Sequence, residues 1–172
     1  KEINPIIQEN IFISRQDWDA HETSWDFQRN ELLNVNAEFL REELHSDSIE
    51  WCVEQYKKKW EQMFNQLHTN EEELNRQFIE IYGLQDELTP DVPIDEITIL
   101  QQGEISFVPS AEGEETPKVM KWNDDVIIKQ LISYAVGCMM GRYRLDKPGL
   151  HIAHPKTTAE EIAPYSYHGR KY

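Results

Sequence analysis

The clearest pattern of apolar and polar positions lies between residues 49 and 68. Apolar side chains recur there at alternating steps of four and three, at Ile49, Val53, Tyr56, Trp60, Met63 and Leu67. This spacing places all six on one face of a helix and leaves most of the charged residues on the other face. The pattern predicts a long amphipathic helix whose apolar face packs into the core.

A second helical segment is predicted directly after it. Thr69 and Glu72 have the spacing of a capping box, in which a threonine begins a helix and a glutamate three residues later closes the cap. Gly83 fits the position just past a helix end. We therefore expect residues 49–68 and 70–82 to form an αα-hairpin or a sharply kinked pair.

The N-terminal part has only a weak pattern. Residues 1–24 carry scattered apolar positions and are expected to form an irregular lead-in. Thr23 or Ser24 has the side chain of a helix cap, which predicts a helix from Trp25 to about residue 33. Another helix is expected over residues 36–45.

A loop and β-hairpin insertion is predicted over residues 85–122. Two apolar segments, 97–101 and 104–108, flank the turn dipeptide Gln102-Gly103. An acidic loop is expected to follow over residues 109–118.

Asn123 or Asp124 then caps a helix over about 124–143, and residues 144–172 are expected to be an irregular tail with a short turn near 159–162. The predicted fold class is mainly α: a helical bundle with a long amphipathic αα-hairpin and a minor β-hairpin, in one domain spanning residues 1–172.

The helix over 124–143 carries small residues every four positions, at Ser133, Gly137 and Gly141. A glycine inside a helix costs about 1 kcal/mol relative to alanine, so two of them need a packing reason. Membrane helices use this spacing, but no apolar run in the chain is long enough to span a bilayer, so no membrane partner is expected. The three residues predict close helix packing.

The net charge of −15 is unevenly distributed. Residues 1–117 hold 27 acidic and 8 basic side chains, whereas residues 118–172 hold 5 acidic and 9 basic ones. The acidic part repels a phosphate backbone, so DNA contact is expected only in the last third. Arg142, Arg144 and Lys147 are the candidate phosphate contacts; interaction with the negative end of the preceding helix is the alternative.

Motifs for catalysis are missing from the chain. The seven glycines never stand two residues apart, which excludes a GxG nucleotide loop, and no Walker, GxSxG, HExxH or NPPY sequence occurs. His151 and His154 form an HxxH without a clear third metal ligand. Cys52 and Cys138 lack CxxC spacing, which favours a cytoplasmic protein with free thiols. No catalytic, cofactor-binding or metal residue is expected, and both ends look cut out of a longer protein.

Three segments together resemble one protein family. They are residues 22–27 (ETSWDF), residues 70–90 (NEEELNRQFIEIYGLQDELTP) and residues 132–143 (ISYAVGCMMGRY). They are similar to the middle and C-terminal region of the large adenine-specific DNA methyltransferases of BREX-type phage defence, the PglX family, which are relatives of fused type II restriction-modification methylases. The resemblance covers most of residues 20–150.

The resemblance implies a role for the parent protein rather than for these residues. Such enzymes transfer a methyl group from S-adenosylmethionine to adenine N6 and extrude the base into a pocket with an NPPY-type motif. Because that motif and the cofactor loop are missing here, no catalytic residue carries over, and the fragment itself needs no cofactor. The resemblance implies a helical connector between the catalytic and target-recognition domains, which reaches DNA through the parent. The alternative is an acidic interaction module that docks another defence-system protein.

Overall fold

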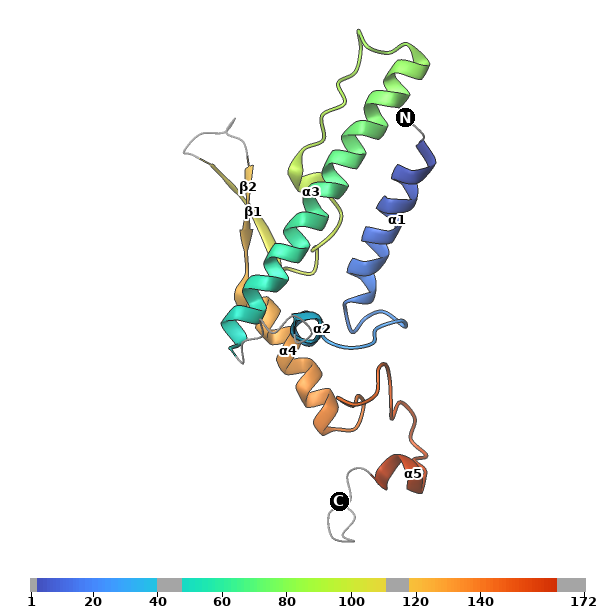
Figure 1. Cartoon of the computed structure of the whole chain (residues 1–172), viewed down its shortest axis with the longest axis vertical. Helices are drawn as coiled ribbons and strands as arrows, with labels where there is room; N and C mark the ends of the chain where they lie inside the picture. The colour runs from blue at the N-terminus through green and yellow to red at the C-terminus, as the bar shows by residue number, and fades with distance from the viewer. Residues whose placement is uncertain (1–2, 40–47, 111–117, 164–172) are drawn as a thin grey trace.

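The computed structural model describes residues 3–39, 48–110 and 118–163. Its elements follow in the order α1 (Ile3–Asp19), α2 (Glu31–Phe39), α3 (Ile49–Tyr82), the 3-10 helix η2 (Ile94–Glu96), β1 (Ile105–Pro109), β2 (Lys118–Trp122), α4 (Asp124–Met139) and α5 (Ala159–Ile162). The expected mainly α class with a minor β-hairpin is confirmed (Figure 1).

Helix α3 is the axis of the fold. Ser48 caps its first turn by accepting from the N–H of Trp51, and Gly83 ends it at φ 67°, as expected. The break expected at Thr69 is wrong, because α3 runs through that residue as one helix of 34 residues. Leu67 and Asn70 on either side of Thr69 are buried, so the packed face continues where the capping pattern predicted a new start.

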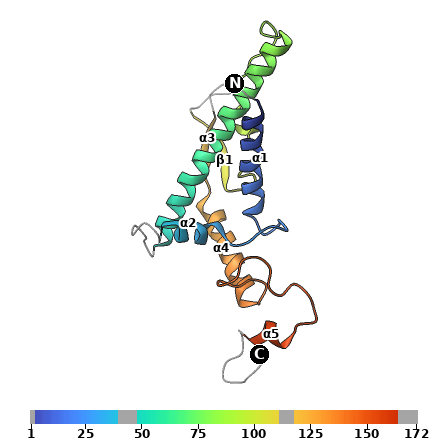
Figure 2. The ribbon, with the colours of Figure 1, turned by 45° about the vertical axis from the view of Figure 1, so that its right-hand side comes forward.

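Helix α1 runs antiparallel beside α3 (Figures 1 and 2). The irregular lead-in expected over residues 1–24 is therefore wrong for Ile3–Asp19. Ile13 is buried in the core shared with α3, and Asn70 of α3 donates to Glu9 of α1 at 2.9 Å. Packing against a neighbouring helix stabilises a segment whose own pattern is weak.

The expected helix from Trp25 is also wrong. Residues 25–30 form turns, and α2 begins at Glu31, next to the side chain of Asn30, which accepts from the N–H of Leu32. An ion pair of 3.1 Å between Lys59 and Glu31 ties α2 to α3. The expected helix over 36–45 overlaps α2 in part, and residues 40–47 lie outside the described residues.

The β-hairpin exists with one of the two expected strands: the segment 104–108 corresponds to β1, whose partner is β2 rather than residues 97–101. β1 and β2 pair antiparallel, with Ile105 opposite Trp122 and Pro109 opposite Lys118. The predicted strand over 97–101 is wrong: Ile97, Ile99 and Leu100 are buried in the core as irregular chain. Most of the expected acidic loop, residues 111–117, lies outside the described residues.

Helix α4 begins as expected but ends at Met139 rather than near residue 143. Gly141 ends it by taking the left-handed conformation, with φ 81°. The chain then folds back, and Gly149 donates to the carbonyl of Gln28 at 2.8 Å. The turn expected near residues 159–162 is the short helix α5. Among the described residues, no helix combines the length and apolar character needed to cross a membrane.

Candidate functional site

A buried ion pair and a glutamine that binds it connect three segments that are distant in the sequence: the end of α1, the segment before β1, and helix α4. His21 Nε2 lies 2.6 Å from Glu104 Oε1, and the two side chains are 5% and 0% exposed. Gln130 of α4 donates to the same carboxylate at 2.6 Å, and the backbone N–H of Gln102 donates to its other oxygen at 2.9 Å. The Nδ1 atom of His21 lies 2.6 Å from the carbonyl oxygen of Asp17 at the end of α1.

The pair holds both groups in their charged forms. Burial alone lowers the pKa of His21, but the hydrogen bond and charge of Glu104 outweigh it and raise that pKa above its ordinary value. Burial likewise acts to raise the pKa of Glu104, and the hydrogen bonds from His21 and Gln130 outweigh it, so that this pKa is lowered. The cluster therefore stabilises the junction of α1, α4 and the segment before β1.

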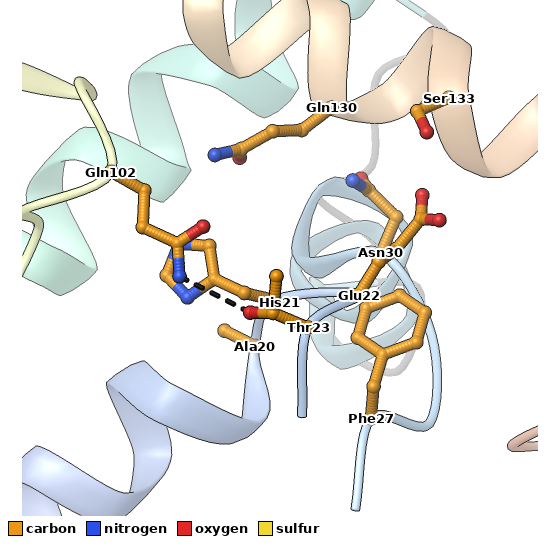
Figure 3. Close-up of a pocket in the computed structure, with 9 residues that line it drawn as sticks. All are labelled: Ala20, His21, Glu22, Thr23, Phe27, Asn30, Gln102, Gln130 and Ser133. Atoms are coloured by element: carbon orange, nitrogen blue, oxygen red, sulfur yellow. Dashed lines mark hydrogen bonds between the residues drawn. The ribbon is translucent and has the colours of Figure 1, made fainter. Parts of the chain in front are cut away.

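A cavity of about 120 Å³ lies next to this pair (Figure 3). Polar side chains from the α1–α2 segment and from α4 line it, among them Glu22, Asn30, Gln130 and Ser133, and Phe27 adds an aromatic wall. Figure 3 shows Glu22, Asn30 and Ser133 pointing toward one another. One carboxylate oxygen of Glu22, Oε1, is buried without a hydrogen-bond partner.

The three basic residues expected to contact phosphate lie in the segment after α4. The Arg142 Nη1 atom lies 3.9 Å from Glu22 Oε2. The guanidinium of Arg144 donates two hydrogen bonds to the carboxylate of Asp146, one of them from Arg144 Nε to Asp146 Oδ1 at 2.8 Å. Lys147 is exposed and forms no ion pair within the described ranges. Two of the three are therefore engaged with carboxylates of their own chain.

The three small residues have different environments. Ser133 is exposed beside the cavity, and Gly137 is buried in α4. The expected common helix face is wrong for Gly141, because that residue lies past the end of α4. The nearest atoms to an added Cβ at Gly137 belong to the ring of Tyr143, at 2.6 Å and 2.9 Å. The close neighbour of this glycine is thus an aromatic ring from the returning chain.

Replacing Gly137 with alanine is expected to destabilise the protein by up to about 2 kcal/mol. Helix propensity alone favours alanine by about 1 kcal/mol, but overpacking costs about 1–3 kcal/mol. Tyr143 has little room to move, since it packs against Tyr134 at 5.2 Å and Phe27 at 5.4 Å between ring centroids. Urea denaturation measures the change. The control is Ser133→Ala in the same helix. If Gly137→Ala were more stable than the natural chain, the ring of Tyr143 would have moved to make room for the added methyl group.

The two histidines of the HxxH motif both contact Glu161 of α5. His154 lies 3.0 Å from Glu161 Oε1, and His151 lies 3.1 Å from the Glu161 carbonyl oxygen. Within residues 3–39, 48–110 and 118–163, no group of three or more potential metal ligands comes together.

Sequence reasoning missed the ion pair and the cavity altogether. His21 and Glu104 are 83 positions apart, and neither belongs to a motif. The one available signal is weak: Glu104 is a charged residue at the start of the otherwise mostly apolar segment 104–108. No local pattern can indicate that such a residue is buried by a helix 26 positions later.

The described residues thus define a helical scaffold with a buried polar junction and a small cavity. The cavity does not fit S-adenosylmethionine, because sites for ligands of such size occupy roughly 300–1,000 Å³.

The chain is 40% identical over 143 residues to the adenine-specific methyltransferase PglX of Lacticaseibacillus casei (strain Zhang), which covers 83% of this chain and 10% of that protein. It is 30% identical over 167 residues to the adenine-specific methyltransferase BrxX of Escherichia coli O9:H4 (strain HS), which covers 96% of this chain and 13% of that protein. The resemblance to the BREX adenine-specific methyltransferases is confirmed. The chain spans about a tenth of the length of these relatives, and no family model matches it.

Proposed function

We propose that this chain is a non-catalytic helical connector of an adenine-specific DNA methyltransferase, placed between the catalytic domain and the target-recognition domain. The observation that carries the proposal is its similarity to about a tenth of two such enzymes, in a stretch without nucleotide-binding or NPPY motifs. The parent would use S-adenosylmethionine and act in a bacterial defence system in the cytoplasm.

The shape of the molecule supports a spacer role. At 1.5 Å per residue, the 34 residues of α3 span about 51 Å. Apolar side chains are exposed in two regions: Phe78, Ile81, Tyr82 and Leu88 at and just after the C-terminal end of α3, and Ile132, Val136, Met139 and Met140 on and just after α4. Exposed apolar patches mark surfaces that other parts of a protein cover. The rest of the parent polypeptide is the natural partner for both regions.

A methylation assay tests the proposal in two parts. The chain alone is expected to transfer no methyl group to DNA and to bind no S-adenosylmethionine in calorimetry. In the full-length Escherichia coli relative, removal of the matching segment is expected to abolish site-specific methylation while cofactor binding persists. Cofactor affinity of the chain alone, or methylation by the shortened relative, would contradict the connector role.

The basic segment after α4 is proposed to approach DNA within the parent. Removing a basic side chain that contacts a phosphate lowers the affinity for DNA. It also reduces the slope of the salt dependence of binding by about one per contact. We expect the Arg142→Ala/Arg144→Ala variant, and Lys147→Ala, to bind a short duplex less tightly and with a flatter salt dependence. Lys129→Ala serves as the control, because it removes one positive charge from α4, outside the basic segment that follows that helix. Unchanged binding in the variants would remove these residues from the proposal.

The second candidate is an acidic module that docks another defence-system protein. Phe78 and Tyr82 stack at 6.5 Å at the exposed end of α3, with acidic residues around them. A partner with basic and apolar groups suits this patch. A pull-down with the chain, at low and high salt, is expected to recover a partner that Phe78→Ser/Tyr82→Ser loses. Equal recovery by that variant would contradict this second role.

A further inference from the structure

The C-terminal end of α3 and the segment that follows it form a groove on the surface. Figures 1 and 2 show this end of α3 projecting beyond the start of α1. The groove has a volume of about 310 Å³. Apolar and polar side chains line it: Arg76, Ile79, Glu80, Gln85, Leu88 and Pro90. Leu88 is 54% exposed, so the apolar part of the groove faces water.

Hydrogen bonds within the chain hold the two sides of this groove together. The amide of Asn75 on α3 donates to the carbonyl oxygen of Pro90 at 3.3 Å, which keeps the following segment along the helix. The N–H of Leu84 donates to the carbonyl of Ile79 at 2.9 Å. The N–H of Leu88 donates to the carbonyl of Leu84 at 3.0 Å. Because the groove is largely preformed, a partner binds it at a lower cost in entropy.

The apolar surface continues from the groove onto α3. Phe78, Ile81 and Tyr82 are 42%, 62% and 71% exposed. An exposed patch of this kind marks a surface that binds another protein segment through apolar side chains. The groove lies between a helix and a turn, so it offers no strand edge with which an extended peptide could pair. The recurring alternative is a helix that lays its apolar face into the groove.

The charges around the groove favour a basic partner. Four exposed carboxylates lie in the lining or in the segment that forms its wall: Glu80, Asp86, Glu87 and Asp91. None of the four forms an ion pair within residues 3–39, 48–110 and 118–163. Arg76, the basic residue of the lining, is already paired with Glu73. The last turn of α3 has no basic residue to offset the negative end of the helix dipole.

We propose that this groove binds a basic amphipathic helix of a partner protein. Apolar side chains of that helix, three and four positions apart, pack on Ile79, Leu88 and Pro90, and its lysines and arginines face the acidic rim. The same rim repels DNA, so the surface is one for protein. The inference rests on the second proposed role, that of a docking module, and adds the chemistry of the partner and the place where it binds.

Binding is tested on the 172-residue chain by fluorescence anisotropy. The probe is a labelled peptide of about 18 leucine and lysine residues arranged as an amphipathic helix. A scrambled peptide keeps the charge without the apolar stripe, and a leucine–glutamate peptide keeps the stripe with the opposite charge. Both are expected to bind at least about tenfold more weakly. Equal binding by the scrambled peptide would overturn the apolar groove, and equal binding by the leucine–glutamate peptide would overturn the basic partner.

A further peptide tests the helical form of the partner. It has the same leucine and lysine pattern with a proline at its centre, which breaks the helix. This peptide is expected to bind at least about tenfold more weakly than the unbroken one. Equal binding would overturn the helix and indicate an extended segment.

Leu88→Ser ties the binding to the groove. It replaces an exposed apolar side chain in the segment after α3 and is expected to lower the affinity for the leucine–lysine peptide at least about tenfold. Ile132→Ser is the matched control, because Ile132 is 56% exposed on α4, outside the groove. That variant is expected to bind as the natural chain does. Unchanged binding by Leu88→Ser would overturn the proposed site.

Glu80→Gln/Glu87→Gln tests the acidic rim. The double variant is expected to bind the peptide about threefold more weakly and with a flatter salt dependence. Glu61→Gln/Glu160→Gln makes the same change in net charge at exposed positions on α3 and α5, outside the groove, and is expected to have a smaller effect. Equal effects of the two double variants would overturn the role of the rim.

The peptide experiment and the pull-down described above fail in different ways. The peptide tests the groove itself, whereas the pull-down tests whether the chain docks another protein. Peptide binding without a recovered partner would contradict the docking role. A recovered partner without peptide binding would overturn this inference alone.

Discussion

Replacing Phe64 with alanine is expected to lower the free energy of unfolding by about 3–5 kcal/mol. Phe64 is 3% exposed on the buried face of α3, and its ring lies 6.2 Å from that of Phe107 in β1. The substitution removes a large apolar side chain from water-free surroundings and leaves a cavity between helix and hairpin. A typical domain is stable by only about 5–15 kcal/mol, so the variant is expected to be partly unfolded at moderate urea concentrations.

The same helix provides a matched control. Phe78 is 42% exposed, four helical turns further along α3. Phe78→Ala is expected to change the stability by less than about 1 kcal/mol, because surface substitutions rarely exceed that. Urea denaturation followed by far-UV circular dichroism measures both variants. Similar losses in the two would show that α3 is not packed by the face that the structure assigns to it.

The packed face of α3 was predictable because helix periodicity is a local property. The seam from Ile49 to Leu67 predicts which residues face the core. The structure buries Val53, Tyr56, Trp60 and Leu67, but it leaves Ile49 53% exposed at the first turn of α3. The capping box at Thr69 failed for a physical reason. A capping sequence stabilises a helix end only where the backbone leaves the helical conformation. Here Asn70 is buried and donates to Glu9 of α1, which favours continuation of α3 through Thr69.

The errors lie where tertiary contacts decide the backbone. Leu100 adopts a positive φ of 60°, which its own preference opposes, while its N–H donates to the carboxylate of Asp17 at 3.0 Å. That hydrogen bond joins residues 83 positions apart and holds the segment 97–101 in an irregular conformation. The apolar residues of that segment, considered without the contact, predict a strand. The same long-range contacts created the candidate site. The charge and motif analysis pointed to Arg142 and Arg144, while the cavity is built around Glu22, His21 and Gln130.

Replacing His21 with alanine is expected to destabilise the protein by about 3–5 kcal/mol near neutral pH. The variant leaves the fully buried carboxylate of Glu104 without its cationic partner. Glu104→Ala is expected to cost less, because an unpaired histidine can lose its proton and stay buried as a neutral ring. His68→Ala is the control: that ring lies 2.7 Å from the carbonyl oxygen of Val92 at a half-buried position, and its loss is expected to cost about 1 kcal/mol.

The pair also predicts how stability depends on pH. The pKa of His21 is raised in the folded state, so its contribution is complete below the unfolded value of 6.5 and is lost as the pH rises through the folded value. The pKa of Glu104 is lowered, so its contribution is complete above 4.5 and is lost as the pH falls through the folded value. The pair therefore stabilises the fold most between pH 4.5 and 6.5.

Glu104→Gln isolates this pH dependence, because glutamine keeps the size of the side chain and removes its charge. The difference in unfolding free energy between the natural chain and this variant is expected to be largest between pH 4.5 and 6.5 and to shrink on both sides. Asp17 contributes to the difference as well, because the charge of Glu104 acts to raise the pKa of Asp17 and is absent from the variant. Urea denaturation at a series of pH values measures the difference. A difference that stays constant with pH would contradict a charged pair, because the titration of its two groups must then be the same in both proteins.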